Sequence, residues 1–185
     1  EAHTGLGDAY SQNGWLTAAR GEYQAVLKVE PLNQVVWFKL GKLYYSQNML
    51  EESALCFEKI LRLNPSNASV YVALASVYQE EYKYGLAIEY YKRALEIDPS
   101  IPEVYVNLAS CYMNSKNMEK ALYYCLEAKK VDPLYADIYY NTGIIYEQEG
   151  KPEEAIKGYN KYLELAPDGA YAKDVKTRLE NLLNR

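Results

Sequence analysis

Apolar and polar residues follow a helical spacing along this chain, and the whole pattern repeats every thirty-four residues. Short polar stretches such as Asn13-Gly14 and Gln47-Asn48 separate the amphipathic segments and are typical of turns. The pattern therefore predicts five pairs of helices joined by short turns. The first helices of the pairs are expected at 2–13, 35–47, 68–81, 102–115 and 136–149, and the second helices at 17–29, 51–63, 85–97, 119–131 and 153–165.

Several positions within each period keep the same kind of residue. The period is marked by prolines at Pro31, Pro65, Pro99, Pro133 and Pro167, and by tyrosines at Tyr10, Tyr44, Tyr78, Tyr112 and Tyr146. Small residues occupy two positions, namely Gly7, Gly41, Ala75, Ala109 and Gly143, and then Ala19, Ser53, Ala87, Ala121 and Ala155. A further position holds Tyr23, Phe57, Tyr91, Cys125 and Tyr159, and a last one holds His3, Trp37, Tyr71, Tyr105 and Tyr139.

These repeated positions have a physical explanation. Small residues allow two antiparallel helices to cross closely, and aromatic rings fill the space around the crossing. Each proline ends the second helix, because it lacks an N–H group and disfavours helix in the residue before it. One such pair cannot bury its apolar face alone, so stability must come from stacking of neighbouring pairs.

The pattern resembles the tetratricopeptide repeat (TPR) family over residues 1–169. The resemblance implies an all-α fold, an α-solenoid in which antiparallel helix pairs stack into a right-handed superhelix. We expect five repeats, at about 1–33, 34–67, 68–101, 102–135 and 136–169. Residues 170–185 break the period and place Val175, Leu179, Leu182 and Leu183 on one apolar stripe. We interpret this segment as an amphipathic helix that caps the array, with a partner-binding helix as the alternative.

Composition excludes several classes of protein. The net charge is −5, and no basic run exceeds Lys129-Lys130, which argues against nucleic-acid binding. No apolar stretch reaches the roughly 18–20 residues that a membrane span needs. The three cysteines, Cys56, Cys111 and Cys125, lack metal or disulfide spacing and suit a reducing compartment, so a cytoplasmic location is favoured. The chain begins with Glu1, which suggests a fragment or a processed protein to which further repeats or domains could be attached.

Candidate chemistry is sparse in this sequence. His3 is the single histidine and stands in an aromatic position, so packing is the favoured interpretation and a metal site is not expected. No serine or cysteine has a histidine available as a base. Asn67-Ala68-Ser69 matches a glycosylation sequon, but we expect Asn67 to cap a helix. We therefore predict no enzyme activity, no cofactor and no metal.

The family resemblance implies a concave groove lined by the first helices. Positions that face inward at helical spacing are the candidate peptide- or partner-binding residues: Phe38, Lys39, Lys42, Tyr45, Val72, Ser76, Gln79, Val106, Asn107, Ser110, Met113, Tyr140, Asn141, Ile144 and Glu147. The basic clamp of chaperone-binding relatives is missing, because Thr4, Phe38, Val72, Val106 and Tyr140 occupy its first position. Asn107 and Asn141 resemble two rungs of the asparagine ladder in the repeat domain of O-linked N-acetylglucosamine transferase, and both are expected at the surface.

Charge divides this predicted groove. Lys39 and Lys42 could attract an acidic ligand, although Lys42 could instead pair with Asp8 one repeat earlier, and Glu103, Asp137 and Glu147 make the other half acidic. The leading hypothesis is a non-catalytic scaffold or adaptor that binds an extended peptide or a partner protein in the groove. The alternatives are a regulatory or substrate-docking arm of a larger enzyme and a self-assembling scaffold.

Overall fold

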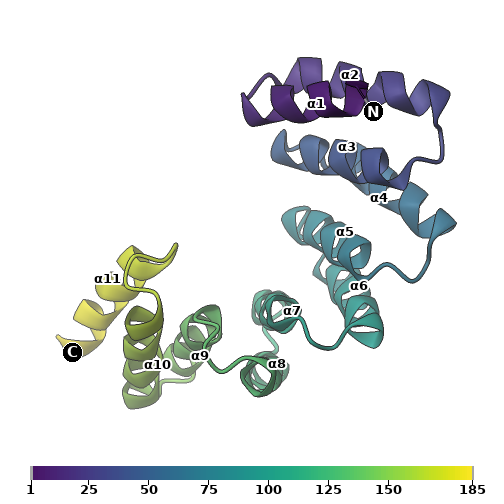
Figure 1. Ribbon diagram of the computed structural model, residues 1–185. Helices are drawn as coiled ribbons and strands as arrows, with labels where there is room; N and C mark the ends of the chain where they lie inside the picture. Colours follow the sequence, from purple (N-terminus) through teal and green to yellow (C-terminus); the bar gives the residue numbers. More distant parts are fainter. Residues whose placement is uncertain (1, 185) are drawn as a thin grey trace. The chain divides into compact units, whose positions relative to one another are not determined.

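The computed structural model describes residues 2–184, and within that range the chain forms eleven α-helices (Figure 1). The helices are α1 (Ala2–Gln12), α2 (Leu16–Val29), α3 (Gln34–Ser46), α4 (Leu50–Leu63), α5 (Ala68–Glu80), α6 (Tyr84–Ile97), α7 (Pro102–Asn114), α8 (Met118–Val131), α9 (Asp137–Gln148), α10 (Pro152–Leu165) and α11 (Ala172–Leu183). The ten helices predicted from the period agree with the structure to within one residue at each end. The predicted all-α fold built from helix pairs is confirmed.

The chain divides into two compact units between Ile97 and Asp98. In the first unit, helices α1 to α6 pack in sequence order, and the first helices α3 and α5 of neighbouring pairs also touch. In the second unit, α7 to α11 pack in the same order, and α7 touches α9. In both units the second helix of a pair therefore packs against the first helix of the next pair, as stacking of repeats requires.

Small residues face aromatic rings where the two helices of a pair cross. A Cβ atom added to Gly41 would lie 2.7 Å from Cε1 of Phe57, and one added to Gly7 would lie 2.6 Å from Cε1 of Tyr23. Gly143 approaches the ring of Tyr159 in the same way. The predicted crossing positions are therefore confirmed, and the aromatic ring of the second helix occupies the space that a side chain on the first helix would need.

The turns and caps of the helices follow from short-range polar contacts. Asn67 caps α5, since its Oδ1 accepts a hydrogen bond from the backbone N–H of Val70 at 3.2 Å. Trp37, Tyr105 and Tyr139 occupy equivalent positions in their repeats, and each stabilises the proline turn that precedes its own helix. The hydrogen bonds run from Trp37 Nε1 to the carbonyl of Pro31 (2.8 Å), from Tyr105 Oη to that of Pro99 (3.0 Å) and from Tyr139 Oη to that of Pro133 (2.8 Å).

The turn inside each helix pair contains one residue in the left-handed region of backbone space. These residues are Gly14 (φ 77°), Asn48 (57°), Tyr82 (59°), Lys116 (59°) and Gly150 (71°), and they are thirty-four residues apart. Glycine and asparagine adopt this conformation readily, whereas a bulky residue does not. Lys116 and Tyr82 are therefore the exceptions in this set, and Tyr82 has the bulkier side chain.

The interpretation that residues 170–185 break the period was wrong, because helix α11 continues the thirty-four-residue period in the place of a first helix. It packs on α10 and buries Ala172, Val175, Leu179 and Leu182, of which Ala172 and Leu179 stand thirty-four residues after Ile138 and Ile145. Leu183, which the sequence placed on the buried stripe, is 70% exposed. Lys176 and Thr177 occupy the positions that would pack on a second helix, so this face of α11 is polar.

Replacement of Gly41 by leucine should destabilise the fold by about 1–3 kcal/mol, because the added side chain must displace the buried ring of Phe57. The matched control is Gly21→Leu, since a Cβ atom at Gly21 meets no other heavy atom within 4 Å. That exposed helical position should gain stability from the better helix propensity of leucine. Urea denaturation of both variants measures the difference, and equal midpoints would show that the crossing is not tightly packed.

Candidate functional site

The candidate residues divide between the two units. Phe38, Lys39, Lys42 and Tyr45 lie on α3, and Val72, Ser76 and Gln79 lie on α5, all in the first unit. The second unit holds the rest, with Val106, Asn107, Ser110 and Met113 on α7, and Tyr140, Asn141, Ile144 and Glu147 on α9. Each set lies at helical spacing on neighbouring first helices, and we describe each as the inward face of its unit.

The inward face of the first unit contains a hollow between α3 and α5. The hollow has a volume of about 350 Å³ and is lined by Val35, Phe38 and Lys39 of α3 and by Ser69 and Val70 of α5. Val35 is 62% exposed, and the Phe38 ring packs on Phe57 with ring centroids 5.5 Å apart. An apolar wall with a lysine beside it is suited to a side chain of a bound segment.

Lys39, and not Lys42, pairs with Asp8. The Nζ atom of Lys39 lies 2.5 Å from Oδ2 of Asp8, and the Tyr23 hydroxyl donates to Oδ1 of the same carboxylate at 2.7 Å. The hydrogen bond from Lys39 lowers the pKa of Asp8, and the Tyr23 bond acts in the same direction against the opposing effect of burial. Lys42 is exposed, so the alternative pairing of Lys42 with Asp8 was wrong.

In the first, third and fifth pairs a core tyrosine hydrogen-bonds to polar residues of the first helix. The Tyr91 hydroxyl lies 3.0 Å from Oγ of Ser76 and donates to Oε1 of Gln79 at 3.1 Å. The Tyr159 hydroxyl donates to Oε2 of Glu147 at 2.6 Å. These inward residues are therefore held from behind by the core.

In the second and fourth pairs the residue behind the inward face has no hydroxyl group. Phe57 and Cys125 occupy the position of Tyr91 in those pairs, and both are buried. Lys42 and Tyr45 on α3, and Ser110 and Met113 on α7, therefore have no core hydroxyl group behind them. The identity of this one core residue decides whether a hydroxyl group from the core engages the inward face of its pair.

Two candidate residues of the second unit are buried, which corrects the sequence-based expectation. Asn141 is 5% exposed, and its Nδ2 atom donates to the backbone carbonyl of Val106 at 3.2 Å. Val106 itself is 6% exposed. The contact joins the first helices of neighbouring pairs, so Asn141 holds α9 on α7 and is not a surface rung of a ladder. Asn107 is half-buried.

Helix α11 covers part of the inward face of α9. The rings of Tyr140 and Tyr171 are stacked with centroids 4.1 Å apart, and the Tyr140 hydroxyl donates to Oδ2 of Asp174 at 3.0 Å. Arg178 donates from Nη1 to Glu147 at 2.9 Å and from Nε to Asp174 at 2.7 Å. Tyr140 and Glu147 are thus engaged within the protein. The sequence signal was the continued period, since Asp174 stands thirty-four residues after Tyr140.

The remaining negative charge of this face lies at the start of α7 and α9. Burial raises the pKa of Asp137, and the charge of Glu103 raises it further. The same two carboxylates add to the effect of burial on Tyr135 and raise its pKa to about 12. The predicted acidic half of the groove is therefore reduced to Glu103 and Asp137, because Arg178 neutralises Glu147.

Other candidate chemistry has a structural explanation. His3 does not pack in the core as expected: its side chain is exposed, and its Nδ1 atom lies 2.6 Å from Oε2 of Glu22. The three cysteines are buried, and burial raises each thiol pKa to about 12. Residues 2–184 contain no group of three or more potential metal ligands. In the same range no helix combines the length and apolar character needed to cross a membrane.

Comparison with known proteins agrees with this architecture. Three tetratricopeptide repeat family models match residues 35–67, 78–124 and 108–180. A comparison with curated proteins finds no match. Among solved structures, MamA is 26% identical with a TM-score of 0.80, covering 88% of this chain and 95% of MamA. PilF of Pseudomonas aeruginosa is 29% identical with a TM-score of 0.74, covering 82% of this chain and 68% of PilF.

A further similar structure is YrrB, a tetratricopeptide repeat protein with an unusual peptide-binding site. It is 24% identical with a TM-score of 0.73, covering 95% of this chain and 90% of YrrB, and it shows the shared fold. Stacked helix pairs with small-to-aromatic crossings define a helical repeat protein with the α-solenoid architecture. The chain belongs to the tetratricopeptide repeat family.

Replacement of Asn141 by alanine should lower the free energy of unfolding by about 0.5–1.5 kcal/mol, since it removes a buried hydrogen bond between neighbouring repeats. The control is Asn160→Ala on the exposed side of α10, which should leave stability nearly unchanged or raise it slightly. Urea denaturation followed by circular dichroism measures both. A loss no larger than that of the control would contradict a structural role for Asn141.

The ion pair of Asp8 should make part of the stability depend on pH. The folded-state pKa of Asp8 lies below its usual value of 3.8, so its contribution is present above that pH. The contribution is lost as the pH falls below 3.8 through the lower folded-state value. The difference in unfolding midpoint between the parent and Asp8→Asn should therefore shrink in this range. Lys39→Met should behave in the same way, and a difference that stays constant with pH would contradict the assignment.

Proposed function

We propose that this chain is a non-catalytic adaptor that holds an extended segment of another protein on the inward faces of its first helices. The observation that carries the proposal is the face of α3 and α5 in the first unit. There, exposed Val35 and the hollow beside Phe38 lie on the same helix face as Lys42, which is exposed and has Phe57, a residue without a hydroxyl group, in the core behind it. Extended segments bind such faces through pockets for alternate side chains.

The second unit supports a polar contribution to the same function. Asn107, Ser110 and Met113 on α7 are half-buried, and no core hydroxyl lies behind Ser110 and Met113, since Cys125 occupies that position. An asparagine amide both donates and accepts, so Asn107 can pair with a peptide unit of any sequence. Glu103 and Asp137 would attract basic residues of the bound segment.

The chemistry of the chain supports a role without catalysis. The cysteine thiols are protonated at neutral pH, because burial raises their pKa values to about 12. The Nδ1 atom of the single histidine lies 2.6 Å from Oε2 of Glu22, so the ring is engaged by that side chain. Binding energy, and not reactivity, is what the inward faces can supply.

The experiment is photo-crosslinking in cells with p-benzoylphenylalanine placed at Val35 or Lys42. Both positions should capture the same partner, because both lie on the inward face of α3. The control position is Glu89, an exposed residue of α6. Capture at Glu89 and none at the two inward positions would overturn the proposal.

A segment captured with p-benzoylphenylalanine at Met113, on the inward face of the second unit, provides a quantitative test. Asn107→Ala should weaken its binding by about 0.5–1.5 kcal/mol, the usual net value of one hydrogen bond. The loss should be similar for captured segments of different sequence, because the amide would pair with backbone. Asn160→Ala is the matched control and should bind as the parent does. Equal affinities of the parent and the Asn107 variant would contradict the role of Asn107.

A further inference from the structure

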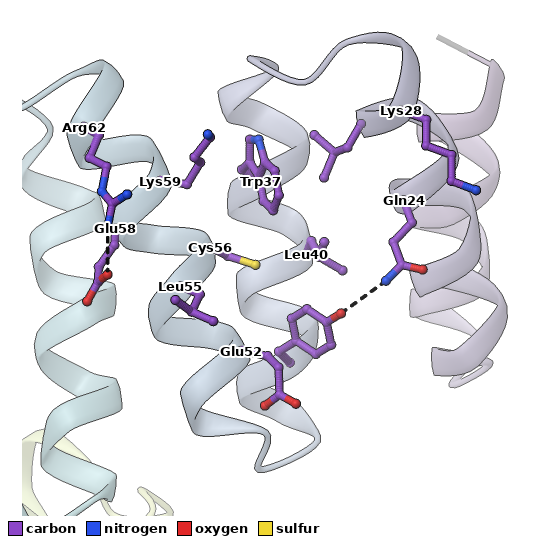
Figure 2. A pocket seen from close by; sticks show the side chains of 12 residues that line it. Gln24, Lys28, Trp37, Leu40, Glu52, Leu55, Cys56, Glu58, Lys59 and Arg62 are labelled. Atoms are coloured by element: carbon purple, nitrogen blue, oxygen red, sulfur yellow. Dashed lines mark hydrogen bonds and ion pairs between the residues drawn. The ribbon is translucent and has the colours of Figure 1, made fainter.

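The first unit contains a second hollow, formed by α2, α3 and α4 and about 600 Å³ in volume (Figure 2). It uses a different stripe of α3 from the inward face. Its apolar wall consists of Leu27, Trp37, Leu40, Leu55 and Cys56. Lys28, Lys59 and Arg62 lie along one end, where Arg62 is paired with Glu58 at 3.8 Å, and Glu52 lies at the other end.

The hollow exists because Cys56 is small. The equivalent residues of the third and fourth repeats are Tyr90 and Tyr124, whereas those of the first and fifth repeats are Glu22 and Gly158. The ring of Tyr90 packs 6.1 Å from that of Tyr71 and 5.4 Å from that of Tyr78, centroid to centroid. Tyr71 and Tyr78 correspond to Trp37 and Tyr44 of the hollow. At the next junction between repeats, an aromatic ring thus fills the space that is open beside Cys56.

The two aromatic rings in the wall of this hollow already have hydrogen-bond partners for their polar groups. The Trp37 indole N–H is satisfied by the carbonyl of Pro31, and the Tyr44 hydroxyl accepts a hydrogen bond from Gln24 at 3.3 Å. The equivalent space of the second unit is about 240 Å³, and there Lys129, Thr142 and Lys157 replace three of the apolar wall residues. The hollow beside Cys56 is accordingly the more apolar of the two.

The same unit presents an aromatic ring with no structural reason for its exposure. Tyr82 occupies the left-handed turn position that holds Gly14, Asn48, Lys116 and Gly150 in the other pairs. A bulky residue is unfavourable in this conformation. The ring is nevertheless 78% exposed, with one edge contact to Tyr84. A residue whose backbone conformation is unfavourable for its side chain, and whose side chain does not stabilise the fold in return, is typical of a functional position.

We propose that Tyr82 of one molecule inserts into the hollow beside Cys56 of a second copy of this chain. Tyr82 then takes the place that Tyr90 fills at the next junction, between the aromatic rings of Trp37 and Tyr44. Glu80 is exposed beside Tyr82, while Glu81 is paired with Lys83, so the turn carries a net negative charge toward Lys28 and Lys59. The two surfaces differ, so the contact is head-to-tail and builds chains or rings of molecules.

The test is sedimentation velocity of the full chain over a range of concentrations. The parent should form species larger than a single chain as concentration rises. Cys56→Tyr fills the hollow with the residue found at the next junction, and Tyr82→Lys installs the residue of the fourth turn, so each variant alone should remain monomeric. An equimolar mixture of the two should form a one-to-one complex, since one variant keeps the ring and the other keeps the open hollow.

A second variant protects the test against misfolding of Cys56→Tyr. Leu55 is 64% exposed at the edge of the hollow, so Leu55→Glu should fold normally, remain monomeric and pair with Tyr82→Lys. The matched control is Leu134→Glu, which alters a leucine that is 68% exposed in the second unit and should associate as the parent does. A parent that stays monomeric overturns the proposal and leaves the hollow to a segment of a different protein. Mixed variants that fail to pair would overturn it as well.

Discussion

The whole structure depends on the contact between a small residue on the first helix of a pair and a ring on the second. Gly41 and Phe57 show its strictness, because even one added methyl group at Gly41 would lie 2.7 Å from the ring. This contact sets the distance between the two helices of a pair. The second helix of each pair then packs against the first helix of the next pair, and burial between pairs provides the stability that one pair lacks. Because every pair must satisfy this constraint, the small and aromatic residues recur every thirty-four residues in the sequence.

The core residue of the second helix also controls the surface. When it is tyrosine, its hydroxyl group crosses the repeat and engages the inward residues, as Tyr91 does with Ser76 and Tyr159 does with Glu147. When it is Phe57 or Cys125, no core hydroxyl group reaches the inward residues of that pair, and Lys39 pairs instead with Asp8 of the preceding repeat. Core packing and availability of the binding face are therefore linked through one position in each repeat.

The sequence predicted the helices closely, because proline, turn residues and helical spacing act locally and recur in every repeat. The sequence could not predict which inward residues form hydrogen bonds or ion pairs within the protein. Asn141 was expected at the surface, but α7 lies close enough to accept its hydrogen bond, and that proximity is a property of packing. Similarly, the amphipathic pattern of α11 predicted a cap, whereas the ion pairs of Arg178 with Glu147 and Asp174 depend on where the cap sits. In each case the missing information is the distance between helices that are far apart in sequence.

A repeat protein provides its own reference for detecting function, because each position occurs several times in nearly the same surroundings. Cys56 differs from the tyrosines of the next two repeats and leaves a hollow, and Tyr82 is the bulkiest residue at a left-handed position that otherwise holds glycine, asparagine and lysine. Either substitution would cost stability in a structure optimised for packing alone, since a hollow forfeits contacts and a left-handed tyrosine is strained. The fold therefore gives up the stability that a buried ring and a relaxed turn would supply. In return the surface carries an apolar hollow and an exposed aromatic ring. Such paired departures from an otherwise regular repeat are where we expect binding specificity to reside.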